Sequence, residues 1–133
     1  MHDLLDIAEF TCPAVAPFLP EDRQVNPDAY GAELAFWLAR ALAAEGVVTT
    51  YPESEDWGWY LEFFTDSGSE FAVHCGNVDG SKERWAIQVR RHARKLFGRD
   101  KPPWSEANAL LDAIVRVLEN DSSVSDLELF WPS

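Results

Sequence analysis

Cysteine, histidine and basic residues are all scarce in this chain, and each shortage excludes a class of protein. Two cysteines in 133 residues, Cys12 and Cys75, are too few for a disulfide scaffold, so we expect reduced thiols. These cysteines and the three histidines never fall in the spacing of a metal-binding motif, so we predict no metal and no cofactor. Glycine-rich phosphate loops, nucleophile elbows and dinucleotide fingerprints are missing as well, so no residue is assigned a catalytic role.

Long apolar runs are also missing. No stretch approaches the ~20 apolar residues of a membrane span, and the start "MHDLLDIAEF" has acids where a signal peptide would have basic residues. We therefore expect a cytoplasmic protein without membrane association. Hydrophobic residues still make up 47% of the chain, which is enough for one core, so residues 1–133 are expected to form a single α+β domain.

Positive charge is rare and concentrated in one segment. The net charge is −12, yet eight of the eleven Lys and Arg residues lie within residues 82–101, against two acids there. This basic segment has a charge of +6, which leaves −18 for the rest of the chain. Such an acidic surface repels nucleic acid and anionic membranes and attracts basic proteins. Two interpretations of the basic segment stay open: charge compensation within the fold, or a site for phosphate, a carboxylate ligand or an acidic partner, with Arg90, Arg91, Arg94 and Lys95 as candidates.

Two segments have the apolar spacing of helices. The first is predicted from about Pro27 to Glu45, with Asn26 as the N-cap and Gly46 as a left-handed stop. The second is predicted from about Ser105 to Asn120. The apolar stripes are Tyr30, Leu34, Trp37, Leu38, Ala41 and Leu42 in the first helix, and Ala107, Leu110, Leu111, Ile114 and Leu118 in the second.

Alternating apolar residues predict strands around these helices. Residues 57–64 and 71–75 flank the turn "TDSGS", and pairing Phe63 with Phe71 puts apolar residues opposite each other. Residues 85–89 follow a turn at Asp79-Gly80 and complete a three-stranded meander. A last strand is predicted at 127–131, and "DIAEFTC" near the start fits a strand or a helical turn nearly equally well. The order β?-α-β-β-β-α-β favours an α+β fold, with a mainly antiparallel sheet of four to five strands and two helices packed on one face.

The stretch "YPESEDWGWY" combines carboxylates with tryptophans and raises the question of a carbohydrate or hydrolase site. Glycoside hydrolysis needs two carboxylates that face each other across a gap, and no second candidate is apparent. In the predicted register Trp57 and Trp59 point into the core, and Gly58 allows another part of the chain to approach closely. The acids then lie together on an exposed loop, and we predict a partner-binding site there, made of Glu53, Glu55 and Asp56.

The solvent face of the meander is the second candidate site. Tyr60, Glu62 and His74 share this face in the predicted register, and Arg90 of the basic segment completes a candidate ligand site. Cys75 follows His74 in the sequence, but adjacent strand residues point to opposite faces, so the two cannot form a nucleophile–base pair. We predict that Cys75 is a buried, unreactive thiol.

Several of these segments together resemble one kind of protein. The runs "NPDAYGAELAFWLARALAAEGVVT", "PESEDWGWYLEF", "FAVHCGNVDG" and "RWAIQV" are similar to a family of small, uncharacterised bacterial proteins with an acid-Asp-Trp-Gly-Trp, then Cys-Gly, then Trp pattern. The resemblance covers about residues 24–90. It implies a bacterial, cytosolic α+β protein, and it brings no catalytic residues with it.

The acidic charge, the small size and the missing catalytic motifs favour a bacterial interaction protein over an enzyme. We expect a binder of a basic protein partner, of the type of an immunity protein or another inhibitor. The alternative is a small enzyme or ligand-binding domain that uses the face of His74, Tyr60 and Glu62. A deep pocket on that face would favour this alternative, whereas a broad acidic surface would favour the binder.

Overall fold

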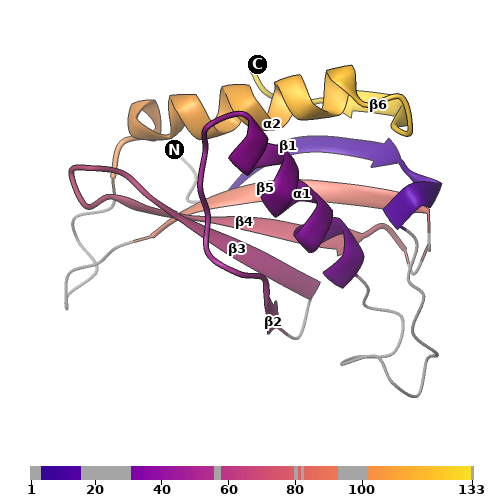
Figure 1. Ribbon diagram of the computed structural model, residues 1–133, viewed down its shortest axis with the longest axis horizontal. Coiled ribbons are helices and arrows are strands. Elements are labelled where there is room, and N and C mark those ends of the chain that lie inside the picture. Colours follow the sequence, from indigo (N-terminus) through magenta and orange to yellow (C-terminus); the bar gives the residue numbers. More distant parts are fainter. Residues whose placement is uncertain are drawn as a thin grey trace.

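The computed structural model describes residues 4–15, 31–55, 58–79, 81, 83–92 and 102–132, and its strands form one antiparallel sheet (Figure 1). The sheet has six strands in the order β2-β3-β4-β5-β1-β6. Their bounds are β1 Leu4–Thr11, β2 Glu53–Glu55, β3 Gly58–Phe64, β4 Glu70–Asn77, β5 Arg84–His92 and β6 Ser125–Leu129. The described helices are α1 Ala32–Ala44 and α2 Asn108–Asn120, with short 3-10 helices η1 Pro13–Val15 and η3 Trp104–Ala107.

The predicted α+β class is confirmed, but the sheet has more strands than predicted. The segment "DIAEFTC" is part of a strand, β1, which pairs with β5 on one side and with β6 on the other. Residues 53–55, which were predicted to lie in a loop, form strand β2 and pair with β3. The sheet therefore has six strands in place of four to five.

The predicted register of the central hairpin is confirmed. Leu61 lies opposite Val73, and Phe63 lies opposite Phe71. The strands β4 and β5 are longer than predicted and stay paired from Glu70–His92 to Asn77–Trp85. Strand β6 lies earlier than the predicted 127–131, because its pairing with β1 starts at Ser125.

Helix α1 begins later than predicted. Its N-cap is Gly31, whose φ of 151° and ψ of −4° are not helical, so the helix starts at Ala32 and not at Pro27. The predicted stop is confirmed, since α1 ends at Ala44 and Gly46 has a left-handed φ of 86°. The remaining residues of the predicted first turn lie outside the described part of the chain: Asn26, Pro27 and Tyr30.

Both helices pack on the same face of the sheet, where one hydrophobic cluster joins them to the strands (Figure 1). The predicted stripe of α2 is buried, although its first turn, from Trp104 to Ala107, is the 3-10 helix η3. Trp59, which we predicted to be a core residue, is partly buried and packs against the cluster. The fully buried centre includes Leu34, Leu38 and Leu42 of α1, Leu110 and Ile114 of α2, and Leu61, Phe71, Val73, Trp85 and Ile87 of the sheet.

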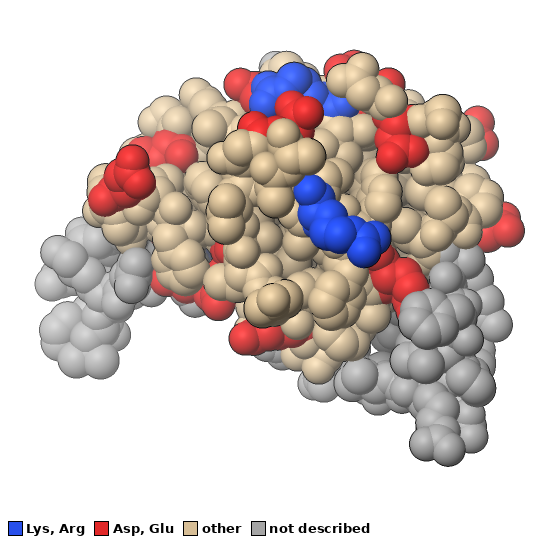
Figure 2. Space-filling view, viewed as in Figure 1, with Lys and Arg blue, Asp and Glu red and all other residues tan. Residues whose placement is uncertain are grey.

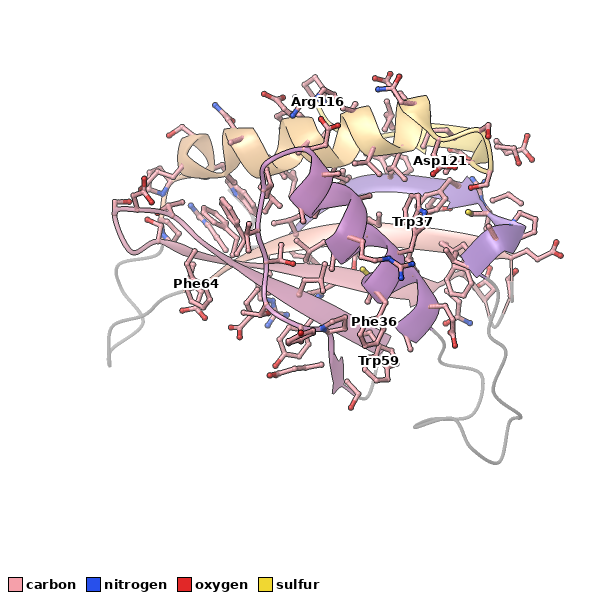
Figure 3. All side chains as sticks on the ribbon, viewed as in Figure 1. Phe36, Trp37, Trp59, Phe64, Arg116 and Asp121 are labelled. Carbon is pink, nitrogen blue, oxygen red and sulfur yellow. The ribbon has the colours of Figure 1, made fainter. Side chains whose placement is uncertain are left out.

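Two glycines bring separate parts of the chain against the backbone carbonyl of Cys75 in β4. A Cβ atom at Gly31 would lie 2.5 Å from this oxygen, and one at Gly58 would lie 2.8 Å from it. The φ angles are 151° and 150°, in a region that residues with a side chain rarely adopt. The side chain of Trp59 packs beside the start of α1, with Cδ1 3.6 Å from the Cβ position of Gly31 (Figure 3). The close approach expected at Gly58 is therefore present.

We predict that Gly58→Ala lowers the free energy of unfolding by at least about 2 kcal/mol, because the new Cβ would meet the Cys75 carbonyl and the backbone would be strained. Urea unfolding followed by tryptophan fluorescence measures the loss. Gly46→Ala is the matched control, since Gly46 also has a positive φ but no atom lies within 4 Å of its Cβ position. Equal losses in the two variants would contradict a tight contact at Gly58.

Candidate functional site

The face of the sheet opposite the helices, which we call the open face, carries a continuous row of polar side chains. The register places Glu53, Tyr60, His74, Gln88 and Asp6 directly opposite one another, from β2 through β3, β4 and β5 to β1. At one end the Tyr60 hydroxyl donates a hydrogen bond to Glu53 Oε2 at 2.5 Å. At the other end Gln88 Nε2 donates to Asp6 Oδ1 at 2.6 Å. The row therefore crosses most of the sheet.

The acids that we predicted to form a partner-binding loop belong mainly to the sheet. Glu53 and Glu55 lie in β2, and Asp56 lies outside the described residues. The loop prediction was wrong because β2 lies at the edge of the sheet, where a short, polar strand needs no alternating apolar residues. Glu53 contributes to the open face, since its carboxylate accepts the Tyr60 hydroxyl.

A shallow hollow of about 290 Å³ interrupts the open face. It forms where Gly76 of β4 lies opposite Ala86 of β5, because these two small residues leave the sheet uncovered between taller neighbours. Its volume is at the lower end of the range of small-molecule sites, so it could hold a small ligand or one side chain. The lining residues are Leu4, His74, Gly76, Asn77, Ala86, Gln88 and Arg90.

The structure brings together one half of the predicted ligand site. His74 and Arg90 line the hollow, whereas Tyr60 and Glu62 share the open face without lining it. Tyr60 is directed toward Glu53 at the edge of the sheet, away from the hollow. Two of the four residues of the predicted ligand site therefore line the hollow, and the other two lie on the same face.

Sequence reasoning placed Gln88 or Arg84 across from His74, but it missed the two small residues that shape the hollow. Gln88 lies opposite His74, and Gly76 and Ala86 form the floor beside them. The sequence signal that could have indicated the hollow is the pair of small residues Gly76 and Ala86, which lie at solvent-facing positions of neighbouring strands. A small residue at such a position has no apolar face to fill, so it indicates a depression of the surface.

Arg84 lies on the open face and makes contacts that stabilise the fold. It donates to Glu128 Oε1 at 3.0 Å and to the carbonyl of Asp126 at 2.7 Å, and it lies 4.0 Å from Glu9. These contacts join β5, β1 and β6. The interpretation of the basic segment as charge compensation within the fold therefore holds for Arg84.

Arg90 and Arg91 differ in their surroundings. Arg91 donates to the carbonyl of Pro102 at 3.4 Å, and its guanidinium lies 5.8 Å from the ring centre of Trp104. Arg90 is exposed, and no hydrogen bond or ion pair engages its guanidinium among the residues that the structure describes. The other predicted candidates, Arg94 and Lys95, lie outside those residues.

Cys75 has no catalytic role in this arrangement. Its side chain is fully buried on the helix side of β4, as predicted, and burial raises the pKa of the thiol from 9.0 to about 12. The thiol therefore stays protonated at neutral pH, and a protonated thiol is a poor nucleophile. Cys12 is buried as well, and both cysteines are free.

Asp121 has a shifted pKa for a structural reason. Hydrogen bonds from the Ser123 hydroxyl and backbone amide, at 2.5 Å and 2.9 Å, hold the pKa of the Asp121 carboxyl below its usual range, and Trp37 adds a third hydrogen bond. Trp37 belongs to α1, and Asp121 follows the end of α2 (Figure 3). The carboxylate thus helps to fix the two helices relative to each other.

A second depression, of about 210 Å³, lies between α1 and the segment that leads to β2. Tyr51 and Val48 at its edge are 86% and 74% exposed, and Arg40 is the one charged residue among the described residues that line it. On the side of the molecule that carries α1, acidic residues are spread over the surface (Figure 2). The depression itself is mainly apolar and offers no acid–base chemistry.

The described residues contain no group of three or more His, Cys, Asp or Glu side chains that could hold a metal ion. Within the same part of the chain, neither α1 nor α2 has the length and apolar character of a membrane-spanning helix. The polar row and the hollow of the open face are therefore the features from which a function has to be argued.

The buried thiol gives the protein a specific dependence on alkaline pH. The folded pKa of Cys75 is raised, so the unfolded chain loses this proton first, and stability falls as pH rises from 9 toward 12. We predict a contribution of at most about 1.4 kcal/mol per pH unit in this range. Urea unfolding at pH 8 and pH 10.5 measures it in the wild type and in Cys75→Ala, in which the decline should be smaller. Identical declines would contradict a buried, protonated thiol.

Comparison with known proteins adds no relative from which a function could be transferred. No protein-family model, no curated protein and no solved structure matches the chain. The resemblance to small bacterial proteins noted in the sequence thus stays an expectation.

Proposed function

We propose that the protein is a small bacterial interaction protein of the cytoplasm, without enzymatic activity, which binds a basic protein partner. The observation that carries this proposal is the charge of the open face. Every strand except β5 contributes at least one carboxylate to it: Asp6, Glu9, Glu53, Glu62, Glu70 and Glu128. Strand β5 contributes Arg84 and Arg90, and Arg84 is already paired with acids of β1 and β6.

An acidic sheet face suits a basic partner for two physical reasons. Its summed negative potential attracts a basic protein during diffusion and raises the rate of association. The carboxylates are carried by paired strands, so they can form ion pairs without ordering a loop. A protein that blocks a basic toxin or another basic protein, as an immunity protein does, is the type of binder that this chemistry fits.

An enzyme at the same face has less support. The hydroxyl of Tyr60 is engaged by Glu53, and the described residues that line the shallow hollow beside His74 include no pair of facing carboxylates. Cys75, the nearest thiol, belongs to the other side of the sheet. The hollow does favour a ligand-binding role as a second candidate.

We predict that neutralising acids of the open face weakens binding of the partner. A triple variant, Asp6→Asn, Glu53→Gln and Glu62→Gln, keeps hydrogen-bond acceptors while removing three negative charges. The partner is first captured from a lysate of the source bacterium with wild-type protein and then purified. Association with the triple variant should be slower by about tenfold at low salt, and the difference should shrink as salt screens the charges.

A second triple variant with the same charge change serves as the matched control. Asp66→Asn, Asp112→Asn and Glu119→Gln replace exposed acids of the β3–β4 turn and of α2, away from the open face. This control should bind the partner at nearly the wild-type rate. The proposal fails if the two triple variants lose the same rate, or if the captured partner is itself acidic.

A further inference from the structure

Arg90 and Arg84 both lie on the open face in β5, but their contacts differ. Arg84 is held by a carboxylate, a backbone carbonyl and the Thr11 hydroxyl. The residues directly opposite Arg90 are Leu4 and Ala72, which offer its guanidinium no acceptor. An exposed cation in an acidic protein thus faces a depression without a partner among the described residues.

The floor and walls of the hollow set the size and shape of what could reach this cation. Gly76 and Ala86 form a small, apolar floor, and Leu4 adds an apolar wall beside Arg90. The volume of about 290 Å³ equals that of about ten water molecules in the liquid, so the hollow has room for a small molecule. A short hydrocarbon portion would lie against these apolar surfaces.

The polar residues at the hollow determine which polar group a ligand would need. A guanidinium binds a carboxylate through two parallel hydrogen bonds, and these are among the strongest polar contacts in proteins. The amide of Gln88 is oriented by Asp6, to which its Nε2 donates at 2.6 Å, and His74 lies opposite Gln88 on the neighbouring strand. Asp6 lies opposite Gln88 and Glu9 lies opposite Ala86, so both acids are next to lining residues of the hollow and repel groups with several negative charges. A single carboxylate therefore fits better than a polyphosphate.

We propose that the hollow lined by Leu4, His74, Gly76, Asn77, Ala86, Gln88 and Arg90 binds a small monocarboxylic acid with a short hydrocarbon part. Arg90 pairs with the carboxylate, and Leu4, Gly76 and Ala86 contact the hydrocarbon. This site does not depend on the basic partner proposed above, since it needs only the isolated chain.

The experiment is a titration of the full, isotope-labelled chain with propionate, followed by the backbone amide signals of Gly76, Ala86 and Gln88 in NMR spectra. Propionamide is the matched neutral probe, and sodium chloride keeps the ionic strength constant. We expect saturable shifts with propionate in the millimolar range and none with propionamide. Saturable shifts with propionamide of equal size, or no shift with propionate, would overturn the proposal.

Variants separate the roles of the cation and of the hollow. Arg90→Gln should weaken propionate binding by at least about tenfold, since it removes a charge-assisted hydrogen bond. Arg40→Gln is the control, because Arg40 is also exposed and free of described ion pairs but belongs to α1. Ala86→Val keeps Arg90 and fills the floor, and it should abolish binding as well. Retention of wild-type affinity in Arg90→Gln or Ala86→Val would assign the shifts to another place and refute the site.

Discussion

The backbone carbonyl of Cys75 is the point at which three parts of the chain meet at close range. Strand β4 carries it, Gly58 at the start of β3 approaches it from the neighbouring strand, and Gly31 approaches it from the start of α1. Only residues without a Cβ can come so near. This contact fixes the position of the start of α1 on the sheet. It also fixes the position of the start of β3, which follows β2 in the chain. The helix stripe and the polar row of the open face both depend on that placement.

Patterns with a clear period were sufficient to predict the centre of the fold. The register of β3 against β4 followed from alternating spacing, and the structure has it. The apolar stripes followed from helical spacing, and their described residues are buried or pack against the core cluster. Strand β1 was ambiguous for a physical reason. A bulge between Asp6 and Ala8 leaves both Ile7 and Ala8 buried, so the alternation that identifies a strand is broken. Strand β2 was missed because it is short, polar and at the edge.

The candidate site was only partly predictable from the sequence. Strand parity was enough to place His74 and Tyr60 on one face and Cys75 on the other, because parity depends on a single strand. The hollow depends on three strands at once, since β1 contributes Leu4 and β5 contributes Arg90 beside His74 of β4. The position of β1 next to β5 requires a long-range pairing, and no local pattern gives it.

The two arginines that β5 contributes to the open face, Arg84 and Arg90, have different surroundings. Arg84 of β5 forms ion pairs with Glu9 of β1 and Glu128 of β6 on the same face, so much of its charge is compensated within the fold. The residues directly opposite Arg90 are the apolar Leu4 and Ala72. Both positions are arginines in the same basic segment, so the local sequence does not distinguish them. The residues opposite them on the neighbouring strands do.

The acidic edge strand has a consequence for self-association. Two copies that joined antiparallel through β2, centred on Ser54, would place Glu53 of one copy opposite Glu55 of the other. Like charges directly opposite each other destabilise a strand pair, so β2 discourages sheet extension by an identical chain. An incoming strand with lysine or arginine at those positions would meet attraction in place of repulsion. The same three residues thus oppose aggregation of the protein with itself and leave its sheet edge open to a basic strand.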